Sequence, residues 1–129
     1  MIRYHPIDSC VAWSNSYNAD LCSFDWQTNT AKFFSEDDHQ TVEVIFAGAD
    51  VIVRMLDEFP LSTESDPDEL EGLIPHHFAY RVEGDPFLEM QSETWRSNER
   101  ALHHYRFMTG AGCLDVVTSA IPHFTILES

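Results

Sequence analysis

The sequence predicts a mainly β protein, with one antiparallel domain built either as a β-sandwich or as a strongly curved sheet. Alternating apolar runs flank short turns, and matching their apolar positions also brings opposite charges face to face. The expected charge pairs are Asp25 with Lys32, Glu43 with Arg54, and Arg106 with Asp115. The buried face of a strand fixes its register, so this agreement favours antiparallel pairing. We expect about six to eight strands and one or two short helices.

The first hairpin is predicted within Leu21–Ser35, around a turn at Thr28–Asn29. In this register Phe24 opposes Phe33, and Trp26 falls on the same core-facing side. The charged pair of this hairpin then lies on the opposite face of the ribbon.

The second hairpin begins with a strand at Thr41–Phe46, which the Gly48–Ala49 pair returns. Glycine occupies the position that a type II′ turn requires. We expect Val44 to oppose Val53 on the core face.

The third hairpin uses the same kind of turn at Gly110–Ala111. Phe107 then opposes Leu114, and Tyr105 opposes Val116. The charged pairs of the three hairpins are expected to be exposed. Each then contributes at most about 1 kcal/mol, so the pairs serve mainly as register markers.

Two further strands are predicted at His76–Glu83 and His123–Leu127. Strict alternation in the first of them places Phe78, Tyr80 and Val82 on one face.

Two segments have a less regular pattern. Phe87–Leu102 fits a strand, but it also fits a helix capped by Asp85, and the pattern leaves both alternatives open. Within the acidic connection Asp57–Pro75, the residues Asp66–Glu69 resemble a short capped helix that Gly72 ends.

Composition indicates one folded domain spanning residues 1–129, because 43% of the residues are hydrophobic. No apolar run is long enough for a membrane span, and the first residues lack the apolar segment of a signal peptide. Cys10, Cys22 and Cys113 are odd in number and lack paired spacing. A reduced, cytoplasmic location is therefore predicted.

Charge is the strongest compositional feature, with 22 Asp and Glu against seven Lys and Arg and a net charge of −15. Such a surface repels phosphate backbones and attracts basic partners, so we expect no nucleic-acid binding and a basic protein partner. The candidate partner-binding acids are Glu36, Asp37, Asp38, Asp57, Glu58, Glu64, Asp66, Asp68, Glu69 and Glu71.

In size, acidity and aromatic content the chain is similar to the small cytosolic immunity proteins that neutralise bacterial toxins. The similarity is one of composition and includes no shared motif. The leading hypothesis is therefore a non-enzymatic acidic binding protein. A basic nuclease-type toxin is one concrete partner.

Histidines support an alternative hypothesis, a small metal-dependent enzyme or a ligand-binding β-barrel. His76, His103 and His123 each begin or nearly begin a predicted strand. Three imidazoles could hold zinc or iron if those strands were neighbours. The spacing matches no metal motif, so the leading expectation is that no cofactor is bound.

A third hypothesis is an oligomerising β module that pairs exposed strand edges between copies of the chain. No serine, cysteine or phosphate-loop motif supports nucleophilic catalysis. Trp13 and Trp95 fall in irregular segments and are expected to be partly exposed or to pack over a sheet edge.

Overall fold

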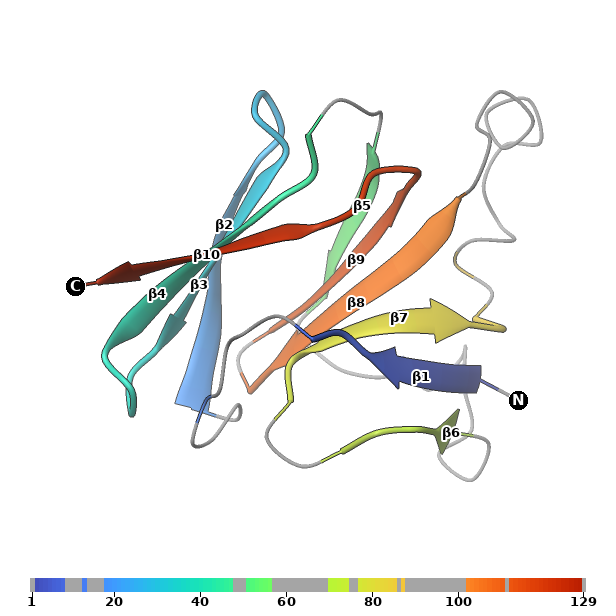
Figure 1. Ribbon diagram of the computed structural model, residues 1–129, viewed down its shortest axis with the longest axis horizontal. Helices are drawn as coiled ribbons and strands as arrows, with labels where there is room; N and C mark the ends of the chain where they lie inside the picture. Colours follow the sequence, from blue (N-terminus) through green and yellow to red (C-terminus); the bar gives the residue numbers. More distant parts are fainter. Residues whose placement is uncertain are drawn as a thin grey trace.

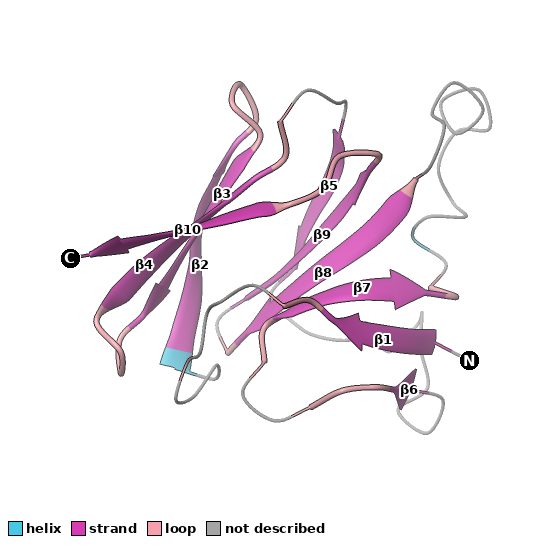
Figure 2. Cartoon of the chain, viewed as in Figure 1, coloured by secondary structure: helices cyan, strands magenta, loops and turns pink. Residues whose placement is uncertain are grey.

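Two β-sheets face each other across a shared apolar core (Figure 1). The computed structural model describes residues 2–8, 13, 18–47, 51–56, 70–74, 77–85, 87, 102–110 and 112–128. Figure 2 shows that strands account for most of this part of the chain.

The larger sheet has six strands, and its neighbours are antiparallel except for β1 and β6, which are parallel. Its order is β5 (Val51–Leu56), β9 (Gly112–Thr118), β8 (His103–Thr109), β7 (Ala79–Glu83), β1 (Ile2–Pro6) and β6 (Leu70–Glu71).

The smaller sheet has four antiparallel strands, in the order β10 (His123–Glu128), β4 (Gln40–Ile45), β3 (Thr30–Ser35) and β2 (Ala19–Asp25). The chain changes sheet between β1 and β2, between β4 and β5, and between β9 and β10. This arrangement leaves four edge strands, β5 and β6 in one sheet and β2 and β10 in the other.

The main core fills the space between the sheets. Phe33 of β3 meets Phe107 of β8 with ring centroids 5.6 Å apart, and Phe78 lies 5.3 Å from Phe33. Val42 and Val44 complete the four-stranded side and are fully buried. Each such side chain contributes about 1.5–3 kcal/mol by leaving water.

The predicted antiparallel β-sandwich is confirmed. The described residues form ten strands rather than six to eight, because β1 and the short edge strand β6 were not predicted. Leu70 and Glu71, expected to complete a helix before Gly72, form β6 instead. Residues 66–69 and 88–101 lie outside the described residues. In the described part no helix is long and apolar enough to cross a membrane.

The register predicted for the third hairpin is confirmed, since Phe107 opposes Leu114 and Tyr105 opposes Val116. The predicted first register is wrong: Phe24 opposes Ala31, and Lys32 opposes Ser23 rather than Asp25. Its turn spans four residues, because the Asp25 carboxylate accepts a hydrogen bond from the Gln27 amide. Asn29 completes this turn in the left-handed region, with φ of 52°.

The second predicted hairpin is wrong because β4 and β5 belong to different sheets. Val53 opposes Val116, and Val44 opposes Ala31 and Phe124. Val44 and Val53 still pack against the same core, one from each sheet. Apolar alternation therefore predicted their inward direction correctly but not the strand that each pairs with.

The face predicted for the strand before Gly84 also needs correction. The strand begins at Ala79, which faces the main core, so alternation directs Tyr80 and Val82 to the opposite face. Phe78 precedes the strand and also joins the main core. Tyr80 and Val82 pack instead in a second cluster on the outer face of the larger sheet.

Two tryptophans exchange their predicted environments. Trp13 is buried, stacks on Phe78 with centroids 4.3 Å apart and donates to Gln40. Trp26, predicted in the core, is 81% exposed because it lies in the four-residue turn between β2 and β3. Trp95 lies outside the described residues.

Candidate functional site

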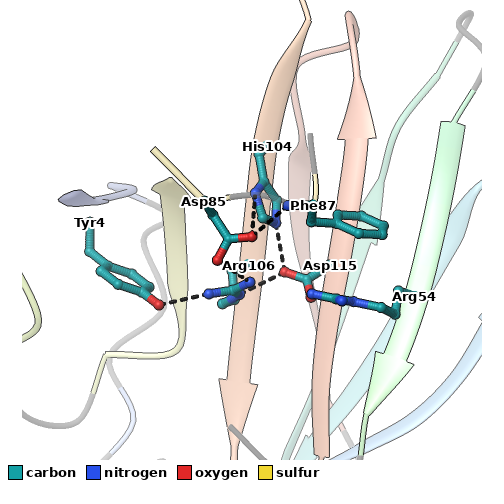
Figure 3. A network of polar contacts seen from close by, with 7 residues as sticks. All are labelled: Tyr4, Arg54, Asp85, Phe87, His104, Arg106 and Asp115. Atoms are coloured by element: carbon teal, nitrogen blue, oxygen red, sulfur yellow. Dashed lines mark hydrogen bonds and ion pairs between the residues drawn. The ribbon is translucent and has the colours of Figure 1, made fainter. Parts of the chain in front are cut away.

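A network of charged side chains is buried on the outer face of the six-stranded sheet (Figure 3). Alternation along β8 directs Tyr105 and Phe107 into the main core and His104 and Arg106 to the other face. Sandwich sheets commonly expose that outer face to water. Here it is covered. The members of this buried charge network are Tyr4, Arg54, Asp85, Phe87, His104, Arg106 and Asp115.

Asp115 of β9 is the central acceptor of the network. Its Oδ1 accepts a hydrogen bond from Arg106 Nε at 2.6 Å and lies 2.6 Å from His104 Nε2. Its Oδ2 accepts from Arg54 Nε at 3.1 Å and from Arg54 Nη2 at 2.9 Å. The sheet explains this convergence, because Arg54 of β5 and Arg106 of β8 are both directly opposite Asp115 in register.

The loop after β7 closes over the network. Arg106 Nη2 donates to Asp85 Oδ2 at 2.9 Å, and the Phe87 amide donates to Asp85 Oδ1 at 2.9 Å. The second bond is local and turns the chain back over the sheet. The Phe87 ring then covers Arg54, whose guanidinium carbon lies 4.2 Å from the ring centroid.

Strand β1 closes the opposite side. Arg106 Nη1 donates to the Tyr4 hydroxyl at 2.7 Å. Gly72, just after β6, has a φ of +94°, and a Cβ added there would overlap the carbonyl oxygen of Tyr4. A glycine is required for this close approach, which fixes the backbone that carries the Tyr4 ring.

The ionisation of the network follows from these contacts. Burial raises the pKa of Asp115, but the hydrogen bond from His104 and the charge of Arg106 outweigh it and lower this pKa to about 2. Burial alone would lower the pKa of Arg106, and Asp115 instead holds it above its ordinary value. Arg106 and Asp115 are therefore both charged at neutral pH, although their side chains are only 2% and 0% exposed.

His104 is the one member with an unsatisfied polar atom among the described residues. Its Nδ1 is buried without a hydrogen-bond partner and lies 4.0 Å from Asp85 Oδ1. A cavity of about 150 Å³ borders His104 and Asp85, with Arg81 and His103 also on its wall. This space could hold ordered water or a small polar ligand.

The network's chemistry favours a structural role. His104 is enclosed, with its side chain 1% exposed. The nearby thiol of Cys113 is also buried, and burial raises its pKa, which disfavours the reactive thiolate. A buried ion pair adds little net stability over an apolar pair, but removing one partner strands an uncompensated charge and is costly.

The structure separates the predicted partner-binding acids. Glu36, Asp37 and Asp38 form the turn between β3 and β4 in the smaller sheet. Glu71 lies on β6 of the larger sheet and forms an ion pair with Arg3 at 3.4 Å. The remaining candidates, Asp57, Glu58, Glu64, Asp66, Asp68 and Glu69, lie outside the described residues.

The predicted histidine site is not assembled in the described part of the chain. His103 begins β8 and His123 begins β10, in different sheets. No group of three or more His, Cys, Asp or Glu side chains able to hold a metal occurs among the described residues. His76 lies outside them, so the zinc or iron site stays a prediction.

Sequence reasoning paired Arg106 with Asp115 correctly but interpreted the pair as exposed, and it missed Asp85, His104 and Tyr4. A usable signal was present in β9. Apart from Asp115, this strand is almost continuously apolar, which is typical of a strand covered on both faces. An acid within such a strand must be buried and therefore needs cationic partners.

No family model, curated protein or solved structure matches the chain.

Proposed function

We propose that the protein is a non-enzymatic binding protein whose acidic surface docks a basic protein partner. The observation that carries this proposal is that the described Lys and Arg side chains already form ion pairs with carboxylates of the same chain. Every Lys and Arg among the described residues has a carboxylate within 4 Å. The pairs are Arg3–Glu71, Lys32–Glu43, Arg54–Asp115, Arg81–Glu83, and Arg106 with Asp85 and Asp115.

The remaining charge is therefore anionic over much of the described surface. It is concentrated at one end of the four-stranded sheet. There Asp20, at the start of β2, lies beside the β3–β4 turn, because Ala19 opposes Ser35 and Asn18 donates to Asp37. We call Asp20, Glu36, Asp37 and Asp38 the acidic end. No described Lys or Arg forms an ion pair with Asp20, Glu36 or Asp37.

Trp26 supports protein binding independently. It is 81% exposed at the other end of the same sheet, and tryptophan is enriched among residues that dominate binding energy. Strands of six residues span roughly 20 Å, so an interface of standard size can reach both the acidic end and Trp26.

A nuclease-type toxin is the concrete partner that this surface suits. The phosphate-binding surface of a nuclease is basic, and an acidic inhibitor can occupy it in place of nucleic acid. In this role the protein would act as an immunity-type inhibitor in the cytoplasm of a bacterium.

The test measures association rates with a panel of basic bacterial nucleases at low and high salt. Electrostatic steering predicts a steep fall in rate with salt. Glu36→Lys should slow association, whereas Asp8→Lys changes the net charge equally at an exposed position after β1 and should have a smaller effect. Salt-independent binding, or equal effects of the two variants, would contradict the proposal.

A further inference from the structure

The free edge of β10 differs from the other three sheet edges in the described structure. Exposed edges can add a strand from another chain, and proteins usually block them with charges, bulges, proline or short length. β2 carries Asp20 and Asp25 and has a register shift between Leu21 and Ser23. β6 has only two residues.

The fourth edge, β5, is also less available than β10. Its first four side chains, Val51 to Arg54, are half-buried, and Arg54 is held by Asp115. β10 instead exposes side chains on both faces. Ile126 points to the core side and is 40% exposed, and Leu127 points outward and is 36% exposed.

β10 also lacks a blocking residue along most of its length. From His123 to Leu127 the sequence is His-Phe-Thr-Ile-Leu, with no Lys, Arg, Asp, Glu or Pro. It is an uncharged segment in a chain of net charge −15, and its residue types favour extended structure.

We infer that β10 pairs antiparallel with β10 of a second copy of this chain. A two-fold axis perpendicular to the sheet keeps core-facing residues of both copies on one side. Among the registers that satisfy this condition, the one that pairs the uncharged stretch His123–Leu127 entirely with itself places Thr125 opposite Thr125, Phe124 opposite Ile126, and His123 opposite Leu127. No like charges then face each other, and Ile126 gains an aromatic neighbour on the core side.

This pairing joins the two four-stranded sheets into one continuous sheet across the dimer. Repulsion between two copies of charge −15 opposes it, and salt screens that repulsion. Dimerisation should therefore strengthen with salt. Docking of a basic partner weakens with salt, so the two proposals can fail independently.

Analytical ultracentrifugation over a range of protein concentrations, at low and high salt, tests the dimer. We expect a concentration-dependent dimer that high salt favours. Ile126→Lys should raise the dissociation constant of the dimer about tenfold or more, which corresponds to at least about 1.4 kcal/mol. Ile121→Lys is the matched control, because it adds the same charge at a residue that is 73% exposed and precedes the strand. A monomer at all concentrations, or equal dimerisation by both variants, overturns the inference.

A crosslink tests the register. Directly opposed residues have Cα atoms about 4.5–5.5 Å apart, within the range that a disulfide spans. In a chain with Cys10 and Cys22 replaced by serine, Thr125→Cys should form a disulfide-linked dimer under mild oxidation. Thr28→Cys, at an exposed turn position, should not. Equal crosslinking of the two variants overturns the inference.

Discussion

Arg106–Asp115 and Lys32–Glu43 are the same kind of pair in two different environments. Each joins residues directly opposite one another on antiparallel strands. The first is fully buried, with N and O atoms 2.6 Å apart, whereas the second is 3.7 Å apart with side chains 48% and 24% exposed. The two ion pairs share the same register but contribute unequally to stability, because water screens the surface pair and is excluded from the buried pair.

The largest expected effect is at Asp115. Asp115→Asn removes the charge that compensates Arg54 and Arg106 and should lower the free energy of unfolding by about 3–5 kcal/mol. Chemical denaturation measures this, with Glu43→Gln as the matched control in the surface pair. Equal losses for the two variants would show that burial does not distinguish the pairs.

The second prediction concerns the pH dependence of the stability that Asp115 contributes. The pKa of Asp115 is about 2 in the folded chain against an ordinary value of 3.8. Its stabilisation is therefore fully present above about pH 4 and is lost as the pH falls towards 2, a change of about 2 kcal/mol. The stability difference between the native chain and Asp115→Asn should narrow across this window. A constant difference would contradict the lowered pKa.

Tyr4→Phe tests the rim of the buried charge network. It removes the hydroxyl that accepts from Arg106 Nη1 while keeping the ring that packs on Tyr80. A loss of about 1–2 kcal/mol is expected, since a buried donor loses its partner. Thermal and chemical denaturation measure it. An unchanged stability would mean that Arg106 satisfies this donor elsewhere.

The smallest effect is expected at the surface pair. Lys32→Ala should change the free energy of unfolding by at most about 1 kcal/mol, and added salt should reduce the effect further. A double-mutant cycle of Lys32 and Glu43 isolates their coupling. A coupling as large as that between Arg106 and Asp115 would refute the comparison.

The hairpins show how far sequence reasoning reaches. The β8–β9 register was predictable because a short turn leaves one partner and few registers. The β2–β3 register was wrong because Asp25 and Asn29 build a longer turn. The predicted β4–β5 pairing was wrong because charge matching assigned Arg54 to Glu43. Glu43 in fact pairs with Lys32, and Arg54 pairs with Asp115.

The candidate sites divide in the same way. The acidity and the Glu36–Asp38 turn could be read directly from the sequence. Its association with Asp20 and the exposure of Trp26 depend on turn geometry and on which strands pair. The buried charge network joins Tyr4 to Arg106, which are 102 residues apart, and no local pattern carries that contact.

The sequence by itself determined the fold class, the inward face of most strands and the excess of negative charge, because each depends on side-chain type and a period of two. Only the tertiary structure decided which strands are neighbours and which sheet face is covered. Those choices depend on how distant segments share one core and on where the loop at Asp85 and Phe87 closes. Coverage excludes water around Asp115 and makes it the central acceptor of a buried charge network, whereas Glu43, on the other sheet, stays partly exposed to water.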